Sequence, residues 1–313
     1  MNRAVQTLHF MAGVTASGKT EISLEWAQNQ GAEILCCDSV AVYQGMNLGS
    51  AKPTEKERAL VPHHGLDLCP VSENYDVIRF ADYARRVVKE VSARGKALLV
   101  VGGSGFYLQS FFLPPSDGIQ VSDAIREEVE SLDTREGRPV MLKRLRALNP
   151  EGLGDLDVHN PRRVMRALER CLSSGKTLDR IRRDYQELPK PFAEFSKRMV
   201  WLDRENEEIG LRISHRTNAM LKEGLVEETR ELLEKGMQGN PTAMSSIGYR
   251  EVIQYIRGQL TKDELPKEIN ASTRRLVAKQ RKWFRNRLPS ESRQILKEAE
   301  IPDLNSLHWI SDS

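Results

Sequence analysis

A phosphate-binding pattern lies close to the start of the chain. Residues 13–20 read Gly-Val-Thr-Ala-Ser-Gly-Lys-Thr, which matches the P-loop pattern GxxxxGK[ST]. Its glycines let backbone N–H groups turn inward around a phosphate, and Lys19 can reach the outer phosphate oxygens. The Thr20 hydroxyl is placed to ligate Mg²⁺, which we therefore expect as a cofactor. The expected phosphate-binding residues are Gly13, Thr15, Ala16, Ser17, Gly18, Lys19 and Thr20.

A carboxylate follows a second short apolar run. Asp38 comes directly after residues 32–37, which have the composition of a buried strand. Ligands of open parallel sheets bind beyond the carboxyl ends of the strands, so we expect Asp38 and the P-loop to face one crevice. A carboxylate there could coordinate a metal, bind an acceptor or take a proton as general base. An Asp-Ser pair also suits a turn or a helix cap.

The segments around these residues predict an α/β fold, with a P-loop NTPase-like parallel sheet core flanked by helices. Strands are expected at residues 7–12, 32–37, 97–101, 199–202 and 308–310, and helices at 19–28, 75–93, 205–235 and 252–288, with breaks at Gly224, Gly236 and Pro266. Between residues 115 and 195 the pattern changes to charge-rich helical segments. We therefore predict an all-helical insertion at 115–195 within a core formed by 1–114 and 196–313.

The end of the third strand narrows the use of the P-loop. P-loop NTPases usually hold Mg²⁺ with a second acidic residue at the end of an apolar strand. The run at residues 97–101 instead ends in Gly102-Gly103-Ser104. This disfavours a motor or a switch GTPase and favours a transferase-type use of the loop.

Composition and charge limit the remaining classes. The 313 residues are 39% hydrophobic and 29% charged, with a net charge of +3, as expected for a soluble globular protein. No apolar run approaches the roughly 20 residues of a membrane span, and residues 1–10 lack an export-signal pattern, so we expect a cytoplasmic protein without membrane contact. Basic residues gather at 157–185 and 274–293, the second run with Trp283 and Phe284, which favours RNA binding over a merely solvated face.

A family resemblance extends over most of the chain. Beside residues 13–20, it rests on Asp38-Ser-Val-Ala-Val-Tyr43 with the following residues 44–53, Leu99 to Tyr107, Asn160 to Glu169, Gly175-Lys-Thr177, Arg212 to Arg216, Ile247-Gly-Tyr-Arg250 and the 274–283 stretch. In this order, these motifs strongly resemble the tRNA dimethylallyltransferases (tRNA isopentenyltransferases). Val14, Ser50 and Ser104 depart from the residues usual in the family.

The resemblance implies an activity and roles for individual residues. Enzymes of this family transfer a dimethylallyl group from dimethylallyl diphosphate to N6 of the adenosine 3′-adjacent to the anticodon in tRNA, and release diphosphate. By position in the family motifs, Asp38 is the base, and Lys19 and Arg216 are catalytic cations. The implied tRNA-binding residues are Asp38, Ser39, Val40, Ala41, Ser104, Arg126, Arg162, Arg163, Val164, Met165, Arg166, Ser245, Ser246, Ile247, Gly248, Tyr249 and Arg250.

The helical insertion is then expected to bind the anticodon stem-loop. Three other activities remain open from the residues alone. An isopentenyltransferase acting on free AMP, ADP or ATP shares the P-loop and the aspartate but needs no basic insertion. A small-molecule kinase would bind ATP in the same loop, and a non-enzymatic RNA-binding protein would leave Lys19, Thr20 and Asp38 unused. We expect a monomer, because tRNA is the one large partner that the sequence suggests.

Overall fold

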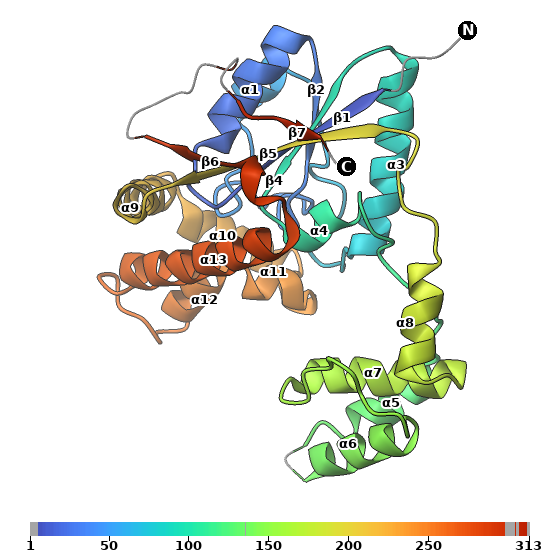
Figure 1. Cartoon of the computed structure of the whole chain (residues 1–313). Helices are drawn as coiled ribbons and strands as arrows, with labels where there is room; N and C mark the ends of the chain where they lie inside the picture. Colours follow the sequence, from blue (N-terminus) through green and yellow to red (C-terminus); the bar gives the residue numbers. More distant parts are fainter. Residues whose placement is uncertain (1–5, 135, 298–303, 305–306, 312–313) are drawn as a thin grey trace, which may run out of the picture. The chain divides into compact units, whose positions relative to one another are not determined.

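The structure, a computed structural model, describes residues 6–134, 136–297, 304 and 307–311. Residues 1–5, part of the stretch analysed for an export signal, lie outside the described residues. The chain divides into two compact units (Figure 1). The first, here called the core unit, is formed by Met1–Phe112 and Phe192–Ser313, and the second, the insertion unit, by Leu113–Pro191. The insertion had been expected at residues 115–195.

The core unit is built on one sheet of seven strands in the described part of the chain. The strands are β1 (Thr7–Gly13), β2 (Glu33–Cys36), β3 (His63–His64), β4 (Leu98–Gly102), β5 (Ser196–Arg204), β6 (Arg293–Leu296) and β7 (Ile310–Ser311). They follow the order β3-β2-β4-β1-β5-β6, with parallel pairing throughout. Strand β7 pairs antiparallel with β5. The carboxyl ends of β1, β2 and β4 therefore lie at one edge, as the predicted α/β class requires.

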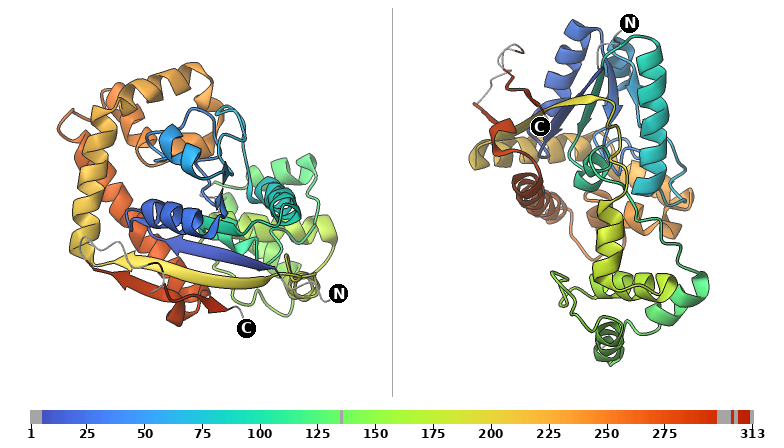
Figure 2. Two further views of the ribbon diagram at one scale, coloured as in Figure 1. Left: turned by 90° about the horizontal axis from the view of Figure 1, so that it is seen from above. Right: turned by 45° about the vertical axis from the view of Figure 1, so that its right-hand side comes forward.

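Helices cover both faces of this sheet (Figure 2). Successive side chains of a strand point to opposite faces, so Phe10 of β1 packs in one hydrophobic core and Met11 in the other. Helix α3 (Val77–Ala93) contributes Phe80 to the Phe10 core. Helix α1 (Lys19–Gln30) contributes residues to the Met11 core on the other face. The central strands β1, β2 and β4 are thus buried on both sides, which explains why they read as continuous apolar runs.

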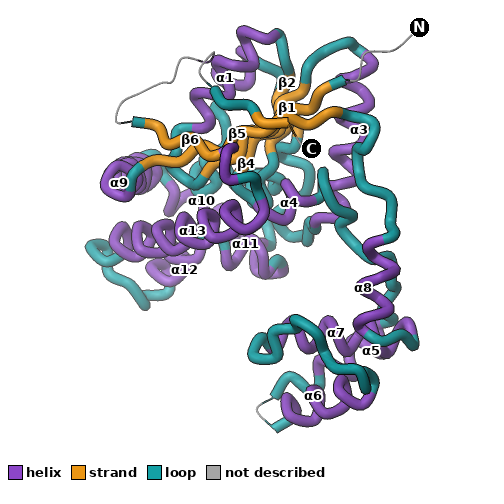
Figure 3. Tube along the Cα trace, viewed as in Figure 1, coloured by secondary structure: helices purple, strands orange, loops and turns teal. Residues whose placement is uncertain are grey.

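Helices after β5 complete the Phe10 side of the core unit (Figure 3). The remaining helices of this unit are α2 (Glu55–Leu60), α4 (Gly105–Gln109), α9 (Asn206–Lys222), α10 (Leu225–Glu234), η1 (Met237–Gly239), α11 (Pro241–Ser245), α12 (Tyr249–Ile256), α13 (Leu265–Arg287) and η2 (Ser290–Ser292). The expected breaks at Gly224 and Gly236 are confirmed. Pro266 is not a break, because it occupies the first turn of α13, where its missing N–H has no helical partner to lose. No helix in the described ranges has the length and apolar character to cross a membrane.

The sequence did not predict strands β3 and β6, and it placed a third strand, β7, two residues too early. Strand β6 contains Arg293 and Gln294 among four residues, and β3 consists of His63 and His64, so neither gives an apolar run. The strand expected at residues 308–310 is observed as Ile310–Ser311. Polar edge strands depend on the pairing offered by a neighbour, which no local pattern reports.

The described part of the insertion unit consists of helices and loops, without a strand. Its helices are α5 (Asp123–Glu130), α6 (Gly137–Ala147), α7 (Pro161–Ser174) and α8 (Leu178–Gln186). They enclose a small core of their own, in which Leu168 of α7 and Leu145 of α6 are fully buried. Asn160 caps α7 by accepting a hydrogen bond from the Arg163 N–H, and Pro161 follows as the first helical residue.

Candidate active site

The predicted P-loop connects β1 to α1. Ala16 (φ 67°) and Gly18 (φ 89°) adopt left-handed backbone conformations, which turn the chain sharply before the helix begins. Gly13 has no room for a side chain, because a Cβ atom there would lie 2.8 Å from Ser17 Oγ. Within the described structure, Ser17 Oγ is buried and has no hydrogen-bond partner. An unpaired hydroxyl inside this loop suits a ligand oxygen.

Arginines from outside the loop hold its carbonyl groups. Arg212 Nε of α9 donates to the Ala16 carbonyl at 2.9 Å, and Arg204 Nε of β5 donates to the Ser17 carbonyl at 2.8 Å. These bonds fix the loop at the amino end of α1, where backbone dipoles favour an anion. The Thr15 N–H is already engaged, since it donates to Gln280 Oε1 of α13 at 2.9 Å.

Three charged side chains influence one another beside the loop. Burial is the main cause that lowers the pKa of Lys19 to about 8, and the Arg216 guanidinium adds to the shift. Burial likewise lowers the pKa of Arg216. The Asp38 carboxylate opposes both shifts, because its charge favours the protonated cations. The arrangement is a cationic site with one carboxylate, and a diphosphate would supply the missing negative charge.

Asp38 lies two residues beyond the end of β2. Its Oδ1 accepts hydrogen bonds from the backbone N–H groups of Val40 at 2.8 Å and Ala41 at 3.3 Å. The turn that the Asp-Ser pair suggested is therefore present. Among the described residues, both hydrogen bonds accepted by the carboxylate are at Oδ1, which leaves Oδ2 available to a ligand.

Two cavities share the wall that contains Asp38. A small one of about 110 Å³ adjoins Lys19 and Thr20 of the P-loop. A larger one of about 550 Å³ is lined by apolar and aromatic side chains, among them Phe106 and Trp283. The residues that line both cavities are Thr15, Asp38, Ser50 and Arg216. Asp38 can therefore meet a phosphate ligand on one side and a larger, flat ligand on the other.

Several residues expected at the RNA line the larger cavity. Ser39, Val40, Ser104, Ser245 and Ile247 all contribute to its wall. Ser104 Oγ accepts a hydrogen bond from the Ser39 N–H at 3.1 Å, so the ends of β2 and β4 are joined at this point.

Other expected RNA contacts in the core unit point inward. Tyr249 is fully buried, and its hydroxyl donates to Glu228 at 2.6 Å. Ser246 is buried and donates to the Thr242 carbonyl. Ala41 and Gly248 are also buried. Tyr249 supports the wall of the larger cavity, because its hydroxyl accepts a hydrogen bond from the N–H of Gly49, which lines that cavity.

Arg250 is half-buried and forms an ion pair with the buried carboxylate of Glu251. Its guanidinium also donates to Ser272 Oγ at 2.9 Å, and the same hydroxyl accepts a bond from Arg275. Two basic side chains are thus oriented by one polar group between α12 and α13.

The insertion unit presents its expected residues in two ways. Arg126, Arg162, Arg163 and Arg166 are exposed. Val164 instead packs in the core of the unit, and Met165 packs partly against it. On α7 the exposed arginines therefore form one face, and the apolar residues between them anchor the helix.

Three contributors to the site were not singled out from the sequence. Gln280 joins the P-loop to the Gly103 carbonyl, to which its Nε2 donates at 3.2 Å. Phe106 is 74% exposed at the large cavity. Lys52 lies in the wall of the small one. Lys52 belongs to residues 44–53 of the family motif, but no local pattern reports its contact with Asp67.

The residues directly after β4, Gly103 and Ser104, carry no carboxylate. An acid does end a neighbouring strand of β1, at Asp203 of β5, but it is fully buried between Arg281 and Arg293. In the described part of the chain, no group of three or more His, Cys, Asp or Glu side chains could hold a metal ion. A Mg²⁺ ion at this site would therefore depend on Thr20 together with oxygens of the ligand and water.

The loop with the P-loop sequence pattern connects β1 to α1 in a P-loop NTPase-like α/β fold, and a carboxylate follows β2. The family model described as IPP transferase matches residues 41–287, and the chain belongs to this family. A tRNA dimethylallyltransferase of Opitutus terrae is 49% identical over 286 residues, which cover 91% of this chain and 92% of that protein.

Solved structures agree with this assignment. The full-length tRNA isopentenylpyrophosphate transferase of Bacillus halodurans has a TM-score of 0.65 and 29% identity, covering 93% of this chain and 89% of its own. A eukaryotic dimethylallyltransferase acting on tRNA shares the fold, with a TM-score of 0.76 at 24% identity, over 89% of this chain and 70% of its own. The expected fold class and family are therefore confirmed.

Proposed function

We propose that this chain transfers the dimethylallyl group of dimethylallyl diphosphate to N6 of the adenosine 3′-adjacent to the anticodon in tRNA. The observation that carries this proposal is the position of Asp38 in the wall shared by the P-loop cavity and the larger apolar cavity. The relatives named as tRNA dimethylallyltransferases support the same reaction.

The donor is assigned to the P-loop side. The loop from Gly13 to Thr20 binds the diphosphate through its backbone N–H groups, Lys19 and the buried Ser17 hydroxyl. Arg216 supplies a second cation from α9. These charges stabilise the leaving diphosphate as the carbon–oxygen bond breaks, where a preorganised positive site has its largest effect.

Asp38 is assigned the role of proton acceptor. The exocyclic amine of adenine is a weak nucleophile, because its lone pair is delocalised into the ring. As N6 bonds to the allylic carbon, the electron pair of the broken carbon–oxygen bond leaves with diphosphate and one N6 proton passes to Asp38. General-base assistance of this kind contributes roughly 10²–10⁴-fold.

Mg²⁺ is assigned to Thr20, the expected metal ligand. The donor set fits, since Mg²⁺ prefers oxygen ligands and usually keeps several waters while it binds substrate phosphates. When bound, the ion would neutralise charge on the diphosphate. Thr20 lines the small cavity together with Lys19, which supports this assignment.

The tRNA is assigned to the larger cavity and to the insertion unit. A base must leave its stack to reach a carboxylate inside a cavity. Phe106 and Trp283 offer aromatic surface there, and Lys279 adds positive charge. In the insertion unit, the exposed Arg126, Arg162, Arg163 and Arg166 are suited to the phosphates of the anticodon arm. A monomer in the cytoplasm, where tRNA is available, completes the proposal.

The deciding experiment follows labelled dimethylallyl from its diphosphate in Mg²⁺ buffer, with unmodified tRNA and AMP as parallel acceptors. Label in tRNA but not in AMP is the expected result. Label in AMP alone would assign the chain to the free-nucleotide enzymes. ATP consumption without prenyl transfer would indicate a kinase.

A further inference from the structure

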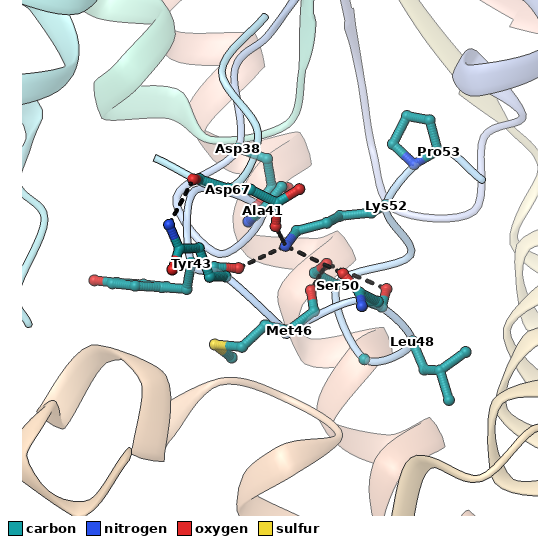
Figure 4. A network of polar contacts seen from close by, with 12 residues as sticks. Asp38, Ala41, Tyr43, Met46, Leu48, Ser50, Lys52, Pro53 and Asp67 are labelled. Atoms are coloured by element: carbon teal, nitrogen blue, oxygen red, sulfur yellow. Dashed lines mark hydrogen bonds and ion pairs between the residues drawn. The ribbon is translucent and has the colours of Figure 1, made fainter. Parts of the chain in front are cut away.

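Lys52 is a buried ammonium in the loop that follows β2. Its side chain is 1% exposed, and Nζ donates to the Tyr43 carbonyl at 2.5 Å, to Asn47 Oδ1 at 3.3 Å and to Asp67 Oδ1 at 2.6 Å (Figure 4). An ammonium has three N–H donors, so these acceptors use all of them. Although Lys52 lines the cavity that contains Lys19, it has no N–H left for a phosphate.

The partner of Lys52 is connected to the proposed base by hydrogen bonds. The Asp67 N–H donates to the Ala41 carbonyl at 3.2 Å. The N–H of the same Ala41 donates to Asp38 Oδ1. Asp67 has a left-handed backbone (φ 55°) and is also paired with Arg58 at 2.9 Å, so its position is fixed on both sides. Displacement of Asp67 would therefore move the turn that orients Asp38.

We propose that Lys52 and Asp67 are positioning residues for the Asp38 carboxylate. Their ion pair holds the 38–41 turn so that Oδ1 stays bound to backbone N–H groups and Oδ2 remains turned toward the N6 proton. This inference rests on the proposed role of Asp38 as proton acceptor. A displacement of about 1 Å at a catalytic group can lower a rate about 10²-fold, so an ion pair that holds Asp38 in place would affect kcat.

The test uses the full chain with tRNA and dimethylallyl diphosphate. Lys52→Met is expected to lower kcat by about 10- to 100-fold, with less than about a twofold change in KM for the donor. Asp67→Asn retains the size of the side chain and an acceptor for Lys52. It is expected to lower kcat by a smaller factor than Lys52→Met. The exposed Lys56, in the neighbouring helix α2, provides the matched control Lys56→Met, with unchanged kcat.

Combination with Asp38→Asn separates positioning from a general loss of structure. If Lys52 acts through Asp38, Lys52→Met lowers kcat no further once Asp38 is asparagine. Equal losses in both backgrounds, or a raised donor KM with normal kcat, would overturn the proposal, because Lys52 would then act on the fold or on the diphosphate. Should Lys52→Met not fold, the same comparison is made with Asp67→Asn.

One result would contradict the proton-acceptor role of Asp38 separately from the positioning role of Lys52 and Asp67. If Asp38→Asn retains full kcat, Asp38 is not the proton acceptor, and the positioning role of Lys52 and Asp67 is overturned with it. Wild-type transfer to tRNA would still support the overall reaction in that case.

Discussion

Two buried charges of the core unit and two ion pairs of the insertion unit are held in opposite ways. In the core unit, Lys52 and Asp203 are almost fully buried, and each is bound by several partners. In the insertion unit, Arg182 pairs with Asp155 and Arg163 with Asp157, and all four side chains are at least 44% exposed. Buried charges with several partners have fixed geometry, which catalysis requires. Exposed arginines can exchange a carboxylate for a phosphate at little cost, which suits nucleic-acid binding.

The largest effect is expected at Asp38, the proposed proton acceptor. Asparagine at position 38 keeps an Oδ1 acceptor for the Val40 and Ala41 N–H groups but cannot take a proton. Asp38→Asn should therefore lower kcat by about 10²–10⁴-fold, with an unchanged melting temperature. Steady-state transfer of labelled dimethylallyl to tRNA measures the rate. A loss of less than threefold would contradict the proton-acceptor role.

Buried charge in the core unit should be costly to disturb. Asp203→Asn removes the fully buried counterion of Arg281, which is 16% exposed, and of Arg293, which is 36% exposed. The free energy of unfolding should fall by about 3–5 kcal/mol, as measured by denaturant titration. A change below 1 kcal/mol would show that this pair behaves like a surface pair, and the contrast between the units would not hold.

In the insertion unit, the exposed arginines should affect tRNA and not the donor. Replacing Arg162 and Arg163 together by glutamine is expected to raise KM for tRNA roughly tenfold at low salt and to reduce the salt dependence by about one counterion per lost contact. The KM for dimethylallyl diphosphate should stay constant. An equal rise in both values would instead indicate damage to the core unit. Lys143→Gln removes one charge from an exposed position of α6 that makes no proposed contact, and it serves as the comparison for loss of surface charge.

The smallest effect is expected for an exposed ion pair of the insertion unit. Asp155 is 89% exposed opposite Arg182, which is 46% exposed. Asp155→Asn should change the free energy of unfolding by less than about 1 kcal/mol, because solvent already screens the pair. The same denaturant titration that measures Asp203→Asn checks this value, and a larger loss here would reverse the comparison.

Much of the site could be predicted because its signals are local. The P-loop pattern, the apolar run before Asp38 and the periodicity of residues 75–93 are each contained in a short window, and each corresponds to an observed element. Strand β6 could not be predicted in this way, because Arg293 and Gln294 give no apolar run. Its pairing with β5 depends on a neighbour distant in sequence.

The sequence by itself determined the order of the elements, the phosphate loop, the position of Asp38 at a strand end and the helical character of the insertion. Only the tertiary structure decided that Lys52 is saturated by its acceptors, that Tyr249 faces inward and that Gln280 reaches Thr15 across 265 residues of chain. The physical reason is that periodicity and spacing specify which way a residue faces on its own element. Which groups meet is set by how the elements pack, because a hydrogen bond requires two partners within about 3 Å.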